Sequence, residues 1–203
     1  MQLLSIVVVF GCFVGAFCDA ECFKKEAFKC NEELLKLVPS QDQEFSICNF
    51  QKKAARCVAE SAVTCDMKFA PEAKAVQVVV EEMCEKGTKL HEVIEENRQC
   101  IMKSITDMSC LESIIAVVGD NPTPSKILEA QKEACRNMDA ITSCTFGKVK
   151  VNCGADGLAA FKRLYEASTE LQRLICKDII LPEKQDSSNS KLPVFYGPLE
   201  FMI

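Results

Sequence analysis

"CRNMDAITSC", residues Cys135 to Cys144, places two cysteines nine residues apart, and "CNFQKKAARC", residues Cys48 to Cys57, makes the same step earlier in the chain. A helix turns by about 100° per residue, so two positions nine residues apart point to nearly opposite faces. Each sulfur of such a pair therefore needs a different partner. We expect a helix that is cross-linked to one neighbour on each side.

The composition makes cysteine chemistry the first question. The chain has 203 residues, 48% of them hydrophobic, a formal net charge of -5, and fourteen cysteines. These values fit one or two ordinary globular domains with a real core. The cysteines serve as disulfides, as metal ligands or as buried thiols.

The N-terminus favours disulfides. "LLSIVVVFGCFVGAF" is an apolar run of fifteen residues, Leu3 to Phe17, and small residues follow it at Cys18 and Ala20. This pattern is typical of a secretory signal peptide, and the run is shorter than the roughly 20 apolar residues of a membrane span. We predict that residues 1–20 are a signal peptide, that the mature protein is secreted and extracellular, and that it has no membrane span.

Cysteine parity supports cleavage after Ala20. That cut leaves twelve cysteines, whereas a cut after Ala16 keeps Cys18 and leaves thirteen, an odd number. The mature chain has no basic excess, so neither nucleic acid nor an anionic membrane surface is expected as a partner.

The twelve remaining cysteines form an internal repeat of six. Their steps run 8, 18, 9, 8, 19 in the first copy and 10, 25, 9, 9, 23 in the second. The extra residues of the second copy fall mainly in the long intervals, where loops and helix extensions tolerate insertion. We predict two tandem units, residues 21–97 and residues 98–181. Their cysteines are Cys22, Cys30, Cys48, Cys57, Cys65 and Cys84, then Cys100, Cys110, Cys135, Cys144, Cys153 and Cys176.

The segments between the cysteines are predicted to be helices. Apolar residues recur at steps of three and four near the end of each copy, which places them on one helix face. These stripes are Ala73, Val76, Val80 and Met83, then Leu158, Phe161, Leu164, Ser168, Leu171 and Ile175. Helix breakers lie between the expected helices, at Pro39 with Ser40, at Pro71, in "GDNPTP" from Gly119 to Pro124, and at Gly154 with Gly157. The fold class is therefore all-α, as two tandem disulfide-stapled three-helix units.

Two segments depart from this pattern. "TFGKVKVNC", Thr145 to Cys153, combines glycine with β-branched alternation, so we expect an extended loop there. Residues 182–203 turn polar and then run to "LPVFYGPLEFMI", which we interpret as a flexible C-terminal tail that docks through Phe195 and Tyr196.

Helix geometry favours one pairing of the cysteines and leaves a rival open. We compare the heights of the cysteines along their helices, at about 1.5 Å per residue. Because the two cysteines of the nine-residue step lie on opposite faces, the middle helix can be cross-linked to both of its neighbours. The favoured pairs are Cys22 with Cys65, Cys30 with Cys57, Cys48 with Cys84, Cys100 with Cys153, Cys110 with Cys144 and Cys135 with Cys176. The rival is a nested ladder, which in the first copy pairs Cys30 with Cys48, Cys22 with Cys57 and Cys65 with Cys84. Six cysteines allow fifteen connectivities, so the sequence alone does not choose.

Signatures of catalysis and metal binding are absent from the sequence. His91 in "KLHEVIEENRQ" is the only histidine, and we expect it at a solvated position of a linker helix. The chain lacks a C-x₂-C pair and a GxSxG motif. Its carboxylates interleave with lysine at helical spacing, which is typical of solvated helix faces. We therefore predict no enzymatic activity, no cofactor and no metal.

The apolar stripes have a second interpretation beside core packing. A cavity between the two units, lined by Val76, Val80, Phe161 and Leu164, would suit a lipid or another hydrophobic small molecule. A solid core would favour a protein that acts through its surface.

The cysteine spacing resembles that of a secreted six-cysteine helical domain of unknown function found widely in invertebrates. The resemblance covers Cys22 to Cys176 in two copies and implies an extracellular helical protein without enzymatic residues. Insect odorant-binding proteins also have six cysteines on helices, but they require a C-x₃-C step that this chain lacks. We predict a secreted, non-enzymatic protein that binds an extracellular protein partner or is a structural component. The alternatives are a carrier of a hydrophobic small molecule and a secreted toxin or effector.

Overall fold

The computed structural model describes residues 19–34, 36 and 47–181, and within these ranges the fold is helical without strands, which confirms the all-α prediction. Residues 19–34 form the first helix. The predicted signal peptide, apart from residues 19–20, and the predicted tail lie outside the described residues, as does the Pro39 breaker. The remaining elements are α2 (Ile47–Thr64), α3 (Ala70–Cys84), α4 (Lys89–Glu96), α5 (Arg98–Ile105), η1 (Met108–Leu111), α6 (Glu112–Val118), α7 (Pro124–Arg136), α8 (Met138–Ile175) and η2 (Cys176–Ile180).

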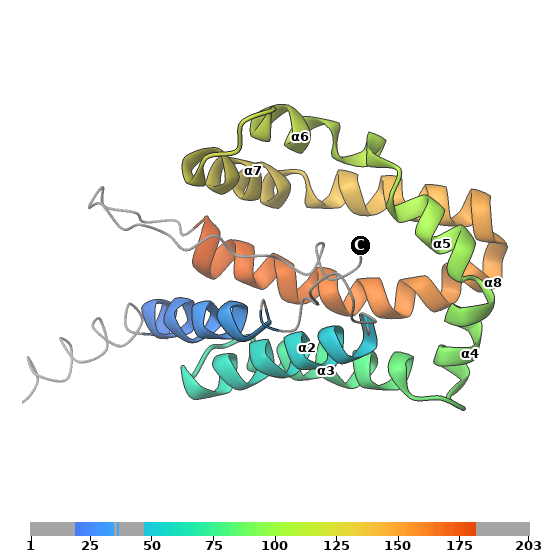
Figure 1. Cartoon of the computed structure of the whole chain (residues 1–203), viewed down its shortest axis with the longest axis horizontal. Coiled ribbons are helices and arrows are strands. Elements are labelled where there is room, and N and C mark those ends of the chain that lie inside the picture. Colours follow the sequence, from blue (N-terminus) through green and yellow to red (C-terminus); the bar gives the residue numbers. More distant parts are fainter. Residues whose placement is uncertain (1–18, 35, 37–46, 182–203) are drawn as a thin grey trace, which may run out of the picture.

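The helices lie in two groups joined by α4 and α5 (Figure 1). The helix of residues 19–34, α2 and α3 lie together on one side, and α6 and α7 lie on the other. The long α8 folds back on itself at Gly154, whose φ of 72° and ψ of -163° are not helical. Its second segment, residues 155–175, runs between the two groups and packs against α3.

Local sequence explains where the helices begin and end. Pro71 lies in the first turn of α3, where its missing N–H is not needed. Thr88 caps α4 by accepting a hydrogen bond from the His91 backbone N–H at 3.1 Å, and Thr123 caps α7 in the same way. Gly119 ends α6 with a φ of 60°, as glycine readily does.

The core consists of two hydrophobic clusters. The larger one joins the first three helices to the second segment of α8 and to η2, and Phe23 packs edge-on against Phe69 with ring centroids 5.1 Å apart. The smaller one gathers Ile101, Val149, Phe161 and Tyr165. The predicted boundary at residue 97 falls between α4 and α5, but the larger cluster crosses it, because residues of the second segment of α8 pack with residues of the first three helices.

The predicted apolar stripes are confirmed. Ala73, Val76, Val80 and Met83 are the buried residues of α3. In the second stripe Leu158 is half-buried, and the other five residues are buried. Burial of one face in this way is what fixes an amphipathic helix in a folded protein.

The prediction of an extended loop at Thr145–Cys153 is wrong, since the segment is helical throughout. Ile141, Thr145 and Val149 recur every four residues and are all buried in the first segment of α8, residues 138–153. Burial of that face outweighs the weak β propensity of the sequence, which tertiary packing commonly overrides.

The second copy does not repeat the single middle helix expected from "CRNMDAITSC". Cys135 lies in the last turn of α7 and Cys144 lies in α8, with Asn137 between the two helices at φ -103° and ψ 11°. The Asn137 side-chain amide donates a hydrogen bond to the Glu133 carbonyl at 3.0 Å, a local contact that competes with helix continuation. In the first copy, by contrast, Cys48 and Cys57 both lie on α2.

Candidate functional site

The twelve cysteines that the sequence places in the mature chain form six disulfides in the structure. The pairs are Cys22–Cys65, Cys30–Cys57, Cys48–Cys84, Cys100–Cys153, Cys110–Cys144 and Cys135–Cys176. These are the pairs of the favoured scheme, and the pairs of the nested ladder do not occur among them. Every bridge joins two cysteines of the same predicted copy.

His91 is half-buried, so the prediction of a solvated position is wrong. Its Nδ1 lies 2.9 Å from the Met83 carbonyl oxygen, because the turn capped by Thr88 folds the start of α4 back onto the end of α3. With Nδ1 bound to a backbone carbonyl, His91 has a structural partner. Among the residues that the structure describes, no group of three His, Cys, Asp or Glu side chains is arranged to hold a metal ion.

Several carboxylates of α3 and α4 lie in ion pairs at the protein surface. Glu82 pairs with Arg163 at 2.5 Å, and Glu95 of α4 pairs with Arg98 of α5 at 3.5 Å. Glu81 lies 3.5 Å from Arg56, and its pKa is lowered by a hydrogen bond from Gln77 and by Arg56. These contacts are those of solvated helix faces.

The four residues proposed to line a cavity do not share one cluster. Val76, Val80 and Leu164 belong to the larger cluster, whereas Phe161 belongs to the smaller one. Phe161 also packs against Phe146 and Tyr165, with ring centroids 6.1 and 5.1 Å away. Burial raises the pKa of Tyr165, and hydrogen bonds with Thr145 and Thr142 oppose that rise.

One part of the chain is held to the rest differently. We define the arm as η1, α6 and α7, residues 108–136. None of the residues of η1 or α6 is buried, and Ala130 is the one buried residue of α7. Helix α6 packs against α7 and η1, and α7 packs against α8 and η2. The arm therefore lies on the core rather than within it, as Figure 1 shows along one edge of the molecule.

Two disulfides fix the arm at both of its ends. Cys110 in η1 is bound to Cys144 in the first segment of α8, and Cys135 in the last turn of α7 is bound to Cys176 at the start of η2. Each Cα–Cα distance is under 6 Å, at 5.8 and 5.6 Å. The two disulfides thus fix the arm to the core, although the arm itself buries few side chains.

A charged contact adds to the anchor at η1. Lys148 Nζ lies 2.5 Å from Asp107 Oδ2, and it also donates to the Asp107 carbonyl and to the Ser109 hydroxyl. Hydrogen bonds from Lys148 and from Ser109 lower the pKa of Asp107 to about 2. The lowered pKa favours the ionised form of Asp107, the form that pairs with Lys148.

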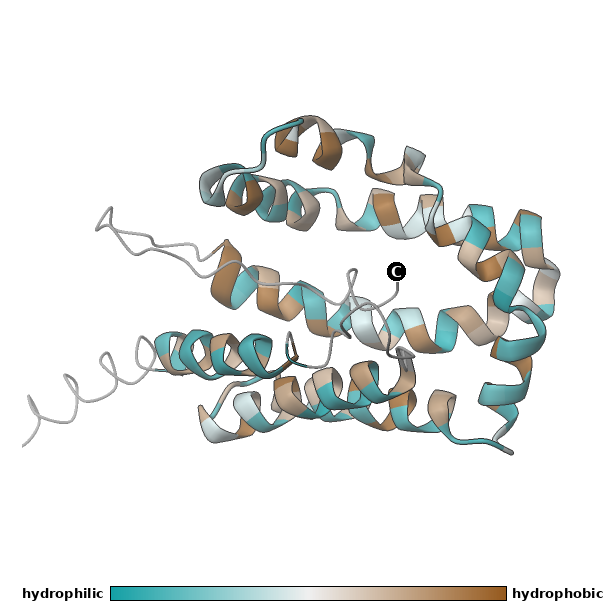
Figure 2. Cartoon of the chain, in the orientation of Figure 1, coloured by the Kyte–Doolittle hydropathy of each residue, from teal (hydrophilic) through white to brown (hydrophobic). Residues whose placement is uncertain are grey.

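Apolar side chains contribute to the exposed surface of the arm. Four residues recur at steps of three and four along η1 and α6, and we call them the arm stripe: Met108, Leu111, Ile115 and Val118. Met108 is 48% exposed and Ile115 is 42% exposed, and the other two are half-buried. The other large exposed apolar residues of the described chain lie singly on four other helices. Figure 2 shows the hydrophobic positions of α6 along the margin of the molecule.

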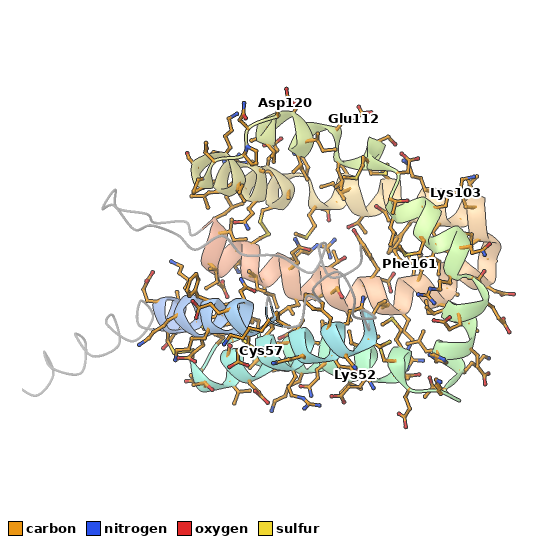
Figure 3. All side chains as sticks on the ribbon, in the orientation of Figure 1. Lys52, Cys57, Lys103, Glu112, Asp120 and Phe161 are labelled. Atoms are coloured by element: carbon orange, nitrogen blue, oxygen red, sulfur yellow. A yellow bond between two sulfur atoms is a disulfide. The ribbon has the colours of Figure 1, made fainter. Side chains whose placement is uncertain are left out.

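Two exposed carboxylates lie close to the arm stripe in sequence, one within it and one after it. Glu112 is the first residue of α6 and Asp120 follows the helix, and Figure 3 shows both at the outer edge of the arm. Neither forms a salt bridge with another described residue, whereas Glu129 and Glu133 are paired with Lys132 and Arg136. Within the described chain, the arm thus presents apolar side chains together with two carboxylates, Glu112 and Asp120, that form no salt bridge.

The sequence analysis did not single out this surface. "IIAVV" from Ile114 to Val118 is a continuous apolar run too short to show a helical period. The signal that indicates it is the interval of 25 residues between Cys110 and Cys135, the longest of either copy.

Comparisons of the chain with models of protein families, with curated proteins and with solved structures find no match. Within the described residues, no helix combines the length and the apolar character needed to cross a membrane.

Proposed function

We propose that this chain is a secreted, non-enzymatic binding protein built from two tandem six-cysteine helical units, and that the arm is its binding surface. The single observation that carries the proposal is the arm itself. Its helix α6 buries no residue, carries an apolar stripe, and is fixed to the core by a disulfide on each side.

Six disulfides support an extracellular location. Such bridges persist in oxidising compartments, and cytosolic thiols are kept reduced. Together with the apolar N-terminal run of the sequence, they support cleavage after Ala20 and secretion of the chain that begins at Glu21.

Backbone geometry at equivalent positions supports the duplication. Asp66 follows Cys65 with a φ of 50°, and Gly154 follows Cys153 with a φ of 72°. Asp66 is the one residue other than glycine with positive φ in the described chain. In both proposed copies the residue after the fifth cysteine therefore has a positive φ, and the chain reverses there toward the last helix. The arm is then an elaboration of the second copy within its long interval.

The partner that suits the arm is an extracellular protein with an apolar segment flanked by basic residues. Apolar side chains at the centre of an interface supply most of the affinity, and complementary charge at the rim sets orientation and association rate. Glu112 and Asp120 supply that rim here.

The test uses a short synthetic amphipathic peptide of leucine and lysine, titrated against the full mature protein by fluorescence anisotropy. Ile115→Ser is expected to weaken binding by about tenfold, equivalent to roughly 1.4 kcal/mol. Val78→Ser is the matched control, because Val78 is 62% exposed on α3, away from the arm. Equal affinity of the two variants, or no saturable binding, would refute the arm as the binding surface.

Native mass spectrometry of protein purified from its source separates this function from the carrier. A surface-binding protein gives the mass of the oxidised chain alone. A retained small-molecule mass would instead support a carrier of hydrophobic molecules.

A further inference from the structure

We infer that Thr123, in the loop between α6 and α7, is the attachment site of an O-linked N-acetylhexosamine. The inference rests on the secretion that is part of the proposed function, because a secreted chain passes the glycosyltransferases of the secretory pathway. It does not depend on the arm stripe. It gives a modification site to a chain whose sequence has no acceptor for an N-linked glycan.

The loop has the composition of an O-glycan acceptor. It reads "GDNPTP" from Gly119 to Pro124, and Thr123 is the only serine or threonine of the sequence with a proline on both sides. Segments in which threonine or serine is mixed with proline carry O-linked glycans in secreted proteins. The sequence therefore distinguishes Thr123 from the other hydroxyl residues of the chain.

The backbone presents Thr123 in an extended conformation. Its φ is -110° and its ψ is 157°, and helix α7 begins at the next residue, Pro124. A residue before proline is pushed out of the helical region, so the proline itself holds Thr123 extended. An extended segment leaves its main-chain groups available for binding in an enzyme cleft.

The loop is accessible in the folded chain. Every residue from Gly119 to Lys126 is exposed. Figure 3 shows Asp120, the second residue of the loop, at the outer edge of the arm. A transferase can therefore reach Thr123 while the two disulfides of the arm stay closed and its helices stay folded.

The hydroxyl proton of Thr123 is not held by a protein acceptor. Thr123 Oγ1 accepts a hydrogen bond from the Lys126 backbone N–H at 3.3 Å, and it donates to no other residue that the structure describes. Thr106 is also exposed, but its hydroxyl donates to the Met102 carbonyl at 2.7 Å. Thr106 would have to break that bond before it could react, and Thr123 would not.

The transfer uses a nucleotide-sugar donor. Thr123 Oγ1 attacks the anomeric carbon of the N-acetylhexosamine, the bond from that carbon to the nucleotide diphosphate breaks, and the hydroxyl proton leaves with the diphosphate. Nothing is oxidised or reduced. The glycosylated Oγ1 keeps lone pairs, so it still accepts the hydrogen bond from Lys126 and still caps α7.

Protein purified from its source tests the site directly. After reduction, trypsin releases one peptide from Ser104 to Lys126, which contains both Thr106 and Thr123. Mass spectrometry with electron-transfer fragmentation should place an N-acetylhexosamine on Thr123. This mass is covalent and survives denaturation, unlike that of a bound ligand. An unmodified peptide, a phosphate on Thr123, or a sugar on Thr106 instead would overturn the inference.

A reconstituted transfer tests whether the loop selects the site. The full mature protein, made without glycosylation, is incubated with a polypeptide N-acetylgalactosaminyltransferase and its nucleotide sugar. Replacing Pro122 and Pro124 together by alanine should lower transfer to Thr123 several-fold, because the loop is no longer held extended. Pro71→Ala is the matched control, since Pro71 lies in the first turn of α3, outside the arm. Equal transfer in the two variants would contradict the inference.

The outcome is distinguishable from that of the peptide titration. An unmodified Thr123 in a chain that binds the leucine and lysine peptide would overturn this inference and leave the proposed binding surface standing. A modified Thr123 in a chain that does not bind the peptide would do the reverse.

Discussion

Replacing Gly154 by alanine tests how α8 reverses direction. Gly154 has a φ of 72° and a ψ of -163°, in a region of backbone conformation that is essentially confined to glycine. An added Cβ would meet no atom within 4 Å. The substitution therefore introduces no steric clash, and its effect on stability comes from backbone strain and from the unfolded chain.

The expected loss follows from two opposing effects. Holding a residue with a Cβ in this conformation costs about 1–3 kcal/mol. Alanine also lowers the conformational entropy of the unfolded chain, which returns about 0.4–1 kcal/mol. The net destabilisation is about 1–2 kcal/mol, and for a chain of this length it lowers Tm by roughly 2–8 °C.

Gly147→Ala is the matched control. Gly147 lies in the same helix, its φ is not positive, and an added Cβ there also meets nothing within 4 Å. Alanine in a helix interior is more stable than glycine by about 0.5–1 kcal/mol, so this variant should unfold at a higher temperature than the parent. Thermal unfolding followed by circular dichroism, with the disulfides intact, measures both variants.

The two substitutions must move Tm in opposite directions. Gly154→Ala with a Tm equal to or above that of Gly147→Ala would refute the reversal at Gly154. In that case α8 would continue as one straight helix, and the second segment could not complete the core of the first copy.

Three further predictions follow from the arm and the core. The double variant Cys135→Ala/Cys176→Ala opens a loop with a sequence separation of 41 residues, and its free energy of unfolding in guanidinium titration should fall by about 3–4 kcal/mol. Amide hydrogen exchange in α7 should become faster, and unchanged exchange there would contradict the anchoring role. In Lys148→Gln, the pKa of Asp107 should rise from about 2 toward the ordinary value of 3.8, as followed by carboxyl NMR, because the main hydrogen bond that lowers it is lost. A depressed pKa stabilises the fold above pH 3.8 and ceases to do so as the pH falls toward 2, so the Lys148 contact should open only in strong acid, and loss of the contact near neutral pH would be inconsistent with it. In Tyr196→Phe, Tyr165 is the only tyrosine left, and alkaline titration followed by absorbance should give it a pKa above 10, because burial raises that pKa. The stability contributed by the neutral phenol should be lost as the pH rises above 10 and through the raised pKa, and a midpoint at or below 10 would show that Tyr165 is not buried.

Much of the helical fold can be predicted from local pattern. The spacing of Ala73, Val76, Val80 and Met83 gives the buried face of α3, because a helix with a single apolar face has one way to bury it. Pro71 and the "GDNPTP" turn mark helix boundaries through backbone chemistry that acts locally. The nine-residue step between Cys48 and Cys57 is also local, since both cysteines lie on α2.

The features that the sequence does not predict depend on how the helices pack against one another. Thr145–Cys153 forms a helix because Thr145 and Val149 are buried by parts of the chain that are remote in sequence. His91 is half-buried because α4 turns back onto Met83. The sequence analysis also missed the arm. Its exposure depends on which other helices pack against it, and the local sequence pattern does not show this.

The central claim is that six disulfides of defined pairing hold these helices together outside the cell. Peptide mapping of the secreted, non-reduced protein tests it most directly, because lysine, arginine and Glu60 provide cleavage sites between all twelve mature cysteines. We expect an N-terminus at Glu21, no free thiol, and linked peptides that join Cys22 to Cys65, Cys30 to Cys57 and Cys48 to Cys84, with the corresponding three pairs in the second copy. Linked peptides that join Cys30 to Cys48 or Cys65 to Cys84, or two or more titratable thiols, would contradict the account.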